Sequence, residues 1–386
     1  MTPGARLSAA VEVLDRILAG APAEQALTNW ARASRFAGSG DRAAVRDLVF
    51  DALRCRRSFG ALGGGETGRG LVLGGLRSAG VDPVPLFSGL GHAPAPLGPE
   101  DQGAERPLPE LVALDCPDWL APRLRASLGD TFAPVMEALR HRAPVFLRVN
   151  LRRTSVADAI ARLAAEGIAT RPHALSRTAL EVTENARKIQ NSSAYLEGLV
   201  ELQDAASQAV VETLPLVDGL RVLDYCAGGG GKTLAIGALC DVSLHAHDAD
   251  PRRMRDLPDR AERAGLAVRQ IATSDVAGAA PFDLVLADVP CSGSGSWRRA
   301  PEAKWAFSEA RLAELLRIQS EILDRTADFV RDGGILAYAT CSLLAEENVE
   351  QVRAFLARRS RFRLEKELRL TPLEGGDGFY LAVLRG

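Results

Sequence analysis

Strand and helix patterns alternate from residue 219 to residue 358, and this alternation most limits how the 386-residue chain can fold. Short runs rich in Val, Leu and Ile follow one another, separated by amphipathic stretches. Such alternation is typical of a doubly wound α/β sheet with mainly parallel strands, whose ligands bind beyond the carboxyl ends of the strands. The residues after each strand are therefore the first candidates for a site. The predicted strands are 221–225, 242–247, 268–272, 283–287 and 335–340, and the predicted helices are 232–240, 251–264, 308–331 and 346–358.

The chain before residue 219 follows other patterns. Apolar residues recur at helical spacing in 4–58 and again in 117–141, which predicts a helical N-terminal region. Thirteen glycines in 60–104 predict short helices joined by loops there. Strand patterns at 145–150 and 180–182 flank a helix pattern at 155–166, which indicates a small α+β module. We expect three parts: a helical domain over 1–135, an α+β subdomain over 140–200 and a catalytic domain over 201–386.

The first strand of the alternating region runs into a glycine-rich loop, Cys226-Ala-Gly-Gly-Gly-Gly-Lys232-Thr233. A phosphate-binding Walker loop needs glycine where Cys226 stands, so this is not an NTPase loop. An acid at a strand end followed by small residues instead lets the backbone approach a nucleoside-bearing ligand. Asp248 ends the next strand, where it can bind ribose hydroxyls, and Asp275 ends the third, where it can meet an adenine amino group. Together these features favour S-adenosylmethionine over a dinucleotide.

Two of the six cysteines stand directly after strands that we expect to be neighbours. Cys291 follows Asp288-Val-Pro, and Cys341 follows Thr340. The absence of any Cys-x-x-Cys pair gives no support to a zinc site or a thioredoxin-like redox centre, and no metal is expected. Side chains at two adjacent strand ends lie over one cleft, beside the expected methyl donor.

A pair of thiols at this place fits methylation of carbon 5 of cytosine. That carbon is a poor nucleophile until a thiolate adds to carbon 6 and makes the ring an enamine, which is covalent catalysis by an activated nucleophile. Asp288 is placed to contact N3 of the base if it carries a proton, and burial shifts the pKa of a carboxyl in that direction. The residues alone do not decide whether Cys291 or Cys341 attacks.

Several motifs of the sequence, taken together, resemble those of the NOL/NOP/Sun family of RNA cytosine-5 methyltransferases. The resemblance is strong over 140–386 and weaker over 1–135, where the helices resemble the NusB-like domain of bacterial Sun/Fmu-type 16S ribosomal RNA enzymes. The motifs that carry it are Leu223-Asp-Tyr-Cys226, Gly230-Gly-Lys-Thr233, Asp288-Val-Pro-Cys-Ser292, Lys304-Trp305, Tyr338-Ala-Thr-Cys-Ser342, Glu346-Glu-Asn348, Gln190-Asn191 and Leu202-Gln-Asp-Ala-Ala-Ser-Gln208.

The resemblance implies a fold and a set of roles. The fold is a Rossmann-like class I methyltransferase domain preceded by a small α+β RNA-binding subdomain and an all-α NusB-like domain. Cys341 is the nucleophile, and Cys291 helps to resolve the covalent adduct with cytosine. The residues implied for S-adenosylmethionine are Cys226, Ala227, Gly228, Gly229, Gly230, Gly231, Lys232, Asp248, Asp275 and Asp288.

One departure from the family pattern lies in the glycine-rich loop. The family loop usually has Ala-Pro where this chain has Gly228 and Gly229. Because proline stiffens a loop and glycine loosens it, we expect the donor to bind with more ordering of the loop.

The RNA-facing residues are predicted from local charge. The chain has a net charge of −2, which argues against indiscriminate binding of nucleic acid, but residues 140–190 carry ten Arg and Lys against four Asp and Glu. Phosphate contacts from such a segment give affinity that falls with salt. The expected RNA contacts are Arg148, Asn150, Arg187, Arg298, Arg299 and Lys304, and the target base reaches Cys341 from a loop or by leaving its stack.

The expected reaction is therefore methylation of a cytosine in bare 16S ribosomal RNA by a cytoplasmic, monomeric enzyme without a membrane anchor. No run of about 18 apolar residues occurs, and Glu12, Asp15 and Arg16 interrupt the start of the chain where a signal peptide needs an apolar run. Transfer RNA or 23S ribosomal RNA is the alternative substrate. A non-catalytic RNA-binding assembly factor is the alternative function, although both cysteines and the strand-end acids speak against it.

Overall fold

The computed structural model describes all 386 residues, and contacts within the chain divide it into two units. The first unit comprises residues 1–142 together with 297–306, and the second comprises 143–296 together with 307–386. The short segment 297–306 thus leaves the α/β part of the chain and belongs with the N-terminal helices. Sequence patterns did not indicate this exchange.

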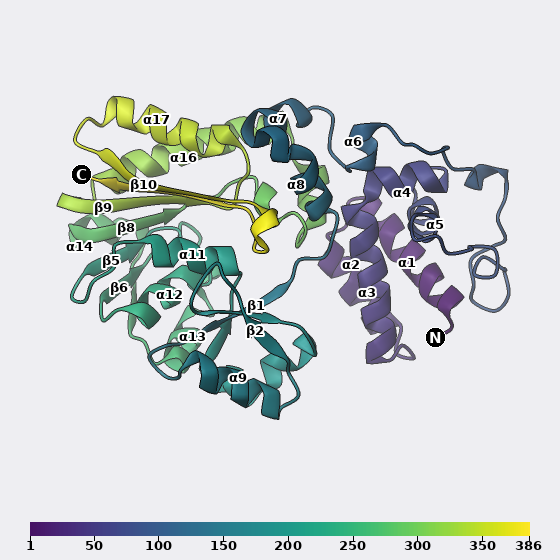
Figure 1. Ribbon diagram of the computed structural model, residues 1–386, viewed down its shortest axis with the longest axis horizontal. Coiled ribbons are helices and arrows are strands. Elements are labelled where there is room, and N and C mark those ends of the chain that lie inside the picture. Colours follow the sequence, from purple (N-terminus) through teal and green to yellow (C-terminus); the bar gives the residue numbers. More distant parts are fainter. The chain divides into compact units, whose positions relative to one another are not determined.

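The first unit is helical, as the apolar periodicity predicts (Figure 1). Its main core is formed by the apolar stripes of α1, α2 and α3 with part of α5, and includes Leu14, Trp30, Val49 and Leu71. Pro3 at the start of α1 and the Thr2 hydroxyl, which accepts from the Ala5 N–H, define where the first helix begins. The helices are α1 (Pro3–Leu18), α2 (Ala23–Ala33), α3 (Ser39–Arg54), α4 (Arg56–Gly63), α5 (Gly68–Ser78), α6 (Glu110–Ala113), α7 (Ala121–Leu128), α8 (Phe132–Leu139) and α15 (Pro301–Ala306).

The glycines of 60–104 have a packing role that the sequence analysis did not anticipate. They allow α4 and α5 to approach closely, since a Cβ added to Gly74 would lie 1.8 Å from the Phe59 carbonyl oxygen. A Cβ on Gly63 would lie equally close to the Gly70 carbonyl oxygen. The expected short helices and loops are confirmed, and several of the glycines serve helix contact rather than flexibility.

The second unit contains a small antiparallel sheet in the order β2-β3-β1-β4. Leu147 and Val149 on its central strand pack with Leu163 of the covering helix in a separate core. The predicted strand–helix–strand module is confirmed, and two short edge strands complete it. The elements are β1 (Val145–Val149), α9 (Val156–Ala165), β2 (Thr170–Pro172), β3 (Ala179–Val182), α10 (Ser193–Leu196) and β4 (Val200–Leu202).

The larger sheet has seven strands in the order β10-β11-β9-β8-β5-β6-β7, with helices on both faces (Figure 1). The five strands from β9 to β7 are parallel, whereas β11 is antiparallel to β9. The strand order reverses between β5 and β8, and this is the switch point at which such sheets bind ligands. The strands are β5 (Arg221–Asp224), β6 (Ser243–Ala246), β7 (Val268–Gln270), β8 (Phe282–Asp288), β9 (Val330–Thr340), β10 (Arg363–Leu370) and β11 (Phe379–Arg385).

Helices cover this sheet largely where the alternation predicts them. The predicted helices 251–264 and 346–358 are each split, because a short 3-10 turn precedes the regular helix. The C-terminal hairpin β10–β11 was not predicted, because β10 is mostly exposed and carries alternating charges instead of an apolar face. The helices are α11 (Ala205–Thr213), α12 (Gly231–Leu239), α13 (Leu257–Ala264), α14 (Val276–Ala279), α16 (Glu309–Ala327) and α17 (Val349–Arg358).

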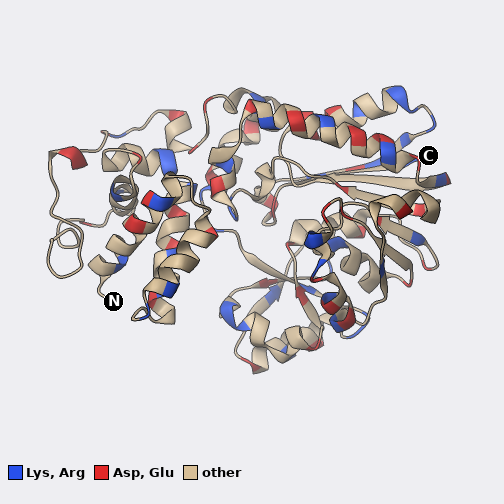
Figure 2. Ribbon diagram, turned by 180° about the vertical axis from the view of Figure 1, so that it is seen from behind, with Lys and Arg blue, Asp and Glu red and all other residues tan.

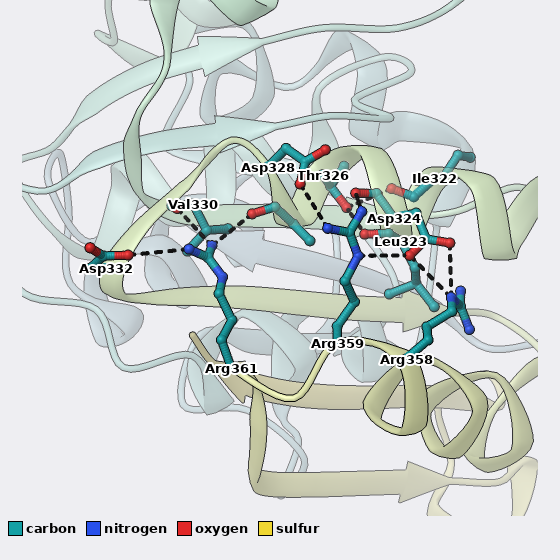
Figure 3. A network of polar contacts seen from close by, with 11 residues as sticks. Ile322, Leu323, Asp324, Thr326, Asp328, Val330, Asp332, Arg358, Arg359 and Arg361 are labelled. Atoms are coloured by element: carbon teal, nitrogen blue, oxygen red, sulfur yellow. Dashed lines mark hydrogen bonds and ion pairs between the residues drawn. The ribbon is translucent and has the colours of Figure 1, made fainter.

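Arginines at the end of α17 and directly after it bond to α16 and to the backbone that follows it (Figure 3). Arg358 and Arg359 both pair with Asp324, at 2.9 and 3.1 Å. Arg361 donates to the carbonyl oxygens of Ala327 and Val330, so it bonds the backbone between α16 and β9. These contacts join the end of α17 to α16 and to the start of β9, and they lie outside the candidate site. None of the helices in the structure combines the length and apolarity needed to cross a lipid bilayer.

Candidate active site

The glycine-rich loop lies at the carboxyl end of β5 and leads directly into α12. Gly228 and Gly230 have φ of +52° and +79°, in the left-handed region that favours glycine. Gly230 also has no room for a side chain, because a Cβ there would lie 2.2 Å from Leu257 Cδ1. The loop is tied to the next strand, since the Ala227 N–H donates to the His247 carbonyl oxygen at 2.9 Å. The loop backbone is therefore set at the switch point of the sheet.

Asp248, after β6, faces this loop as predicted. It is buried and accepts hydrogen bonds from the N–H groups of Gly228 and Asp250, at 2.9 and 3.0 Å. Arg253 forms an ion pair with it at 3.1 Å, through a side chain that is 58% exposed. Asp275 lies at the end of a short turn after β7 and is exposed, with the Ser274 hydroxyl donating to it. Both acids follow the strands to which the sequence assigns them.

Three carboxylates gather around Cys226 in the loop. Burial, and then the charges of Asp224, Asp288 and Asp248, raise the pKa of the Cys226 thiol. Asp224 is fully buried, and its Oδ2 accepts from the Thr233 hydroxyl at 2.7 Å, while its Oδ1 has no partner. Burial raises the pKa of Asp224 to about 7, although the Thr233 hydrogen bond acts in the opposite direction. This end of β5 thus has a negative potential and one unsatisfied acceptor.

Lys232, in the first turn of α12, reaches across to the end of β8. Its Nζ donates to Asp288 Oδ2 at 2.6 Å and lies 4.7 Å from the centre of the Phe379 ring. Burial lowers the pKa of Lys232, but the charge and hydrogen bond of Asp288 outweigh burial and raise it, with smaller contributions from Cys341 and Asp224. Lys232 is therefore a cation at the end of β8. The contact of Asp288 with N3 of the base stays a prediction.

The two cysteines at the ends of β8 and β9 lie side by side, as predicted. Their Sγ atoms are 3.4 Å apart. The hydrogen bond to Cys341, then burial, then the charges of Cys341 and Glu347 raise the pKa of Cys291 well above its ordinary value. The two sulfurs are within reach of a thiol hydrogen bond, in which either can be the donor.

Four of the six predicted RNA contacts are buried. Arg148 donates to the Leu234 carbonyl oxygen at 3.1 Å, and burial lowers its pKa to about 10. Asn150 donates to the carbonyl oxygens of Gly198 and Ala264, and Lys304 to that of Arg54. Arg298 is also buried. These positions do not fit a direct contact with RNA phosphates, and this corrects the expectation for them.

Arg187 and Arg299 are exposed, as an RNA contact requires. The rest of the basic segment is less positive than its composition indicates, because acids from other parts of the chain neutralise it. Arg162 pairs with Glu197 and Arg177 with Glu212. Figure 2 shows the resulting mixture of both signs over the small sheet. A count of charge along the chain misses such partners, because they are distant in sequence.

Comparison with known proteins finds relatives over most of this chain. Residues 211–385 match the family described as 16S rRNA methyltransferase RsmB/F, and residues 116–189 match the ferredoxin-like domain of RsmF/B-like methyltransferases. Ribosomal RNA small subunit methyltransferase B is 36% identical to this chain in Citrobacter koseri and 33% identical in Serratia proteamaculans. Each alignment covers 69% of this chain, which spans 66% of the length of these relatives.

Solved structures share the fold. PH0851 superposes on the whole chain with a TM-score of 0.78 at 23% identity, and 99% of that chain is covered. A methyltransferase homolog protein from Pyrococcus horikoshii superposes on 72% of this chain and 97% of its own, with a TM-score of 0.63 at 25% identity.

The order of the large sheet and the glycine loop at its switch point define a Rossmann-like methyltransferase domain that follows a helical region, as predicted. With the family match and the relatives above, the chain belongs to the Sun/RsmB family of methyltransferases.

Proposed function

We propose that this protein transfers a methyl group from S-adenosylmethionine to carbon 5 of a cytosine in 16S ribosomal RNA. The observation that carries the proposal is the pair of thiols 3.4 Å apart at the ends of β8 and β9, next to the Lys232–Asp288 ion pair. The names of the relatives support small-subunit ribosomal RNA as the substrate class. We further propose that the RNA is bound bare, before the subunit is fully assembled, and that the enzyme acts as a monomer.

The residues at the switch point fit S-adenosylmethionine. The bound donor would supply an activated methyl group next to a positively charged sulfur. The negative potential of Asp224, Asp248 and Asp288, felt at Cys226, suits such a cation. The orphaned Oδ1 of Asp224 offers an acceptor to a ligand amino group. Ribose hydroxyls at Asp248 would replace the contact with Arg253, whose exposed side chain can move away.

Cys341 is the proposed nucleophile. Its sulfur lies 3.4 Å from Cys291 Sγ. Its charge is among the causes that raise the pKa of Lys232, so the nucleophile lies in the field of a cation, the kind of site in which cysteines attack. The thiolate adds to carbon 6 of cytosine, forming an S–C6 bond, and carbon 5 becomes nucleophilic enough to take the methyl group. A water molecule then accepts the proton from carbon 5, and the electron pair of that C–H bond re-forms the C5–C6 double bond. The S–C6 bond breaks at the same time and returns the Cys341 thiolate. Cys291 assists this release.

Lys232 and Asp288 are proposed to hold the base during addition. The added electron pair raises the negative charge on the pyrimidine ring, and the ammonium of Lys232 stabilises it at close range. Asp288 keeps that ammonium in place through the 2.6 Å contact.

The first prediction separates the roles of the two thiols. With tritium-labelled S-adenosylmethionine and unmodified 16S ribosomal RNA, the wild-type protein is expected to produce labelled 5-methylcytosine, and Cys341→Ala none. Cys291→Ala is expected to remain attached to RNA, visible as a slower band on a denaturing gel. Full activity of Cys341→Ala would sink the mechanism. If the wild-type protein binds the donor but transfers no methyl group to this RNA, transfer RNA and 23S ribosomal RNA are the substrates to test next.

A further inference from the structure

A single buried carboxylate joins the loops that carry the two cysteines. Glu347, in the short turn Ala345–Glu347 after β9, is fully buried. Its Oε2 accepts hydrogen bonds from the hydroxyls of Ser292 and Ser342, each at 2.5 Å. These serines are the residues directly after Cys291 and Cys341, and their hydroxyl oxygens lie 3.2 Å apart. One oxygen atom therefore fixes the two loops to each other.

The other oxygen of Glu347 bonds only the Cys291 side. Oε1 accepts from the Ser292 N–H at 2.8 Å and from Gln319 Nε2 at 3.0 Å. Gln319 also donates to the Pro290 carbonyl oxygen at 3.0 Å, so α16 helps to hold the residue before Cys291. The four acceptor positions of the carboxylate are thus filled by hydroxyl, amide and backbone donors, and none of these donors is a cation.

The loop of Cys341 has additional bonds that do not involve Glu347. The Gly295 N–H, in the loop that follows Cys291, donates to the Cys341 carbonyl oxygen at 2.9 Å, so this bond restrains both loops. Two further bonds restrain the Cys341 loop alone. Asn348 donates to the Ser342 carbonyl oxygen at 2.8 Å and accepts from the Thr340 hydroxyl at 2.5 Å. Loss of the Glu347 carboxylate therefore loosens the Cys291 loop more than the Cys341 loop.

A buried charge without a cationic partner is costly, so a role beyond packing is the better explanation for its presence. The charge also acts on the site, since it is among the causes that raise the pKa of Cys291. Position and electrostatics thus point to the same thiol.

We propose that Glu347 is a positioning residue that holds the Cys291 thiol against Cys341 for the release of the methylated base. The proposal rests on the proposed function above. Glu347 contacts neither Cys291 nor Cys341 through its side chain, and it acts through Ser292 and Gln319. Formation of the S–C6 bond depends on Cys341 and persists without Glu347, whereas breaking that bond slows.

The test uses the full chain, unmodified 16S ribosomal RNA and S-adenosylmethionine, with Glu347→Gln compared with Glu350→Gln. Glu350 lies three residues further on, in the first turn of α17, and is exposed, which makes it the matched control. The measurements are the rate of methyl transfer, the KM for the donor and the fraction of protein bound covalently to RNA on a denaturing gel. Thermal unfolding and donor binding show whether each variant is folded.

Glu347→Gln is expected to reduce kcat at least about tenfold, with a KM within about twofold of the wild type and several times more covalent adduct. Adding Cys341→Ala should remove that adduct. A kcat equal to that of the wild type overturns the proposal. A joint decrease in kcat and in adduct also overturns it, because a purely structural role lowers both. The control should behave as the wild type.

Substitutions of the two serines that bond Glu347 provide a second test if Glu347→Gln does not fold. Ser292→Ala removes the hydroxyl contact to the Cys291 loop, and Ser342→Ala removes the equivalent contact to the Cys341 loop. Ser292→Ala is expected to accumulate more adduct than Ser342→Ala, and the reverse order or equal amounts contradict the proposal. A wild-type protein that never transfers methyl to RNA refutes the proposed function, whereas an active wild type with an indifferent Glu347 refutes only this inference.

Discussion

At the scale of single residues, Asp224 is an acidic side chain in a buried site that disfavours its charged form. It is 1% exposed, has one hydrogen bond from Thr233 and lies near the acid Asp288. Burial is the main reason why its pKa rises to about 7. The folded protein therefore binds a proton here that the unfolded chain releases at lower pH.

The raised pKa predicts that Asp224→Asn changes the stability of the protein by an amount that depends on pH. Since the folded pKa lies above the unfolded one, the stabilising protonation is complete below pH 4 and is lost as pH rises through about 7. Asparagine does not titrate, so only the wild type loses this stabilisation. The free energy of unfolding of the variant, relative to that of the wild type, should therefore rise by roughly 2–3 kcal/mol between pH 5 and pH 8. Urea unfolding at both pH values measures this gain. A difference between the two proteins that does not change with pH would contradict the assigned shift.

At the scale of elements, the turn from β5 into α12 depends on one glycine. Gly230 is the N-cap of α12 in left-handed conformation, and Leu257 of α13 packs against it. The family resemblance drew attention to Gly228 and Gly229, where the chain departs from the pattern. The steric demand is greater at Gly230, which the pattern keeps.

Gly230→Ala should therefore be destabilising. The positive φ and the clash with Leu257 are expected to cost about 1–3 kcal/mol of unfolding free energy and to weaken binding of the donor. Gly278→Ala is the control, because this exposed glycine lies in α14 and a Cβ there meets nothing within 4 Å. The control should be neutral or slightly more stable. Equal urea midpoints for the two variants would show that the loop tolerates a side chain.

At the scale of the whole molecule, the chain passes from the methyltransferase unit into the helical unit directly after the Cys291 loop. Within the helical unit, Trp305 Nε1 donates to the Leu53 carbonyl oxygen at 2.6 Å and Lys304 Nζ to that of Arg54 at 3.1 Å. Burial lowers the pKa of Lys304 to about 8. The Lys-Trp motif therefore anchors a segment by bonding the end of α3, instead of facing RNA.

Trp305→Phe tests this anchor. The ring remains, but the Leu53 carbonyl loses its donor, so the free energy of unfolding should fall by about 1–3 kcal/mol. Donor binding should be unchanged, because the residues proposed for it belong to the other unit. Chemical denaturation and a donor-binding isotherm give the two values. An unchanged unfolding curve would mean that the hydrogen bond contributes nothing to the anchor.

Much of the site was predictable because it depends on strand ends. The alternation predicted parallel strands, and such strands present their carboxyl ends at one edge of the sheet. The site residues placed at or directly after these ends are Asp224, Asp248, Asp288, Cys291 and Cys341. The resemblance to the family then distinguished between the two thiols. The RNA contacts were less predictable, because Arg148 and Lys304 look like surface cations in sequence. Both are buried in the fold, where backbone carbonyl oxygens distant in sequence accept hydrogen bonds from them.

The amino-acid sequence by itself determined the sheet type, the glycine loop and the thiol pair, because these depend on local periodicity and on motifs at strand ends. Only the tertiary structure decided which groups form ion pairs and hydrogen bonds with one another. It brought Lys232 to Asp288, joined both cysteine loops through Glu347 and moved 297–306 into the helical unit. The physical reason is that burial and charge pairing arise between residues far apart in the chain, and no local pattern encodes which of them will meet.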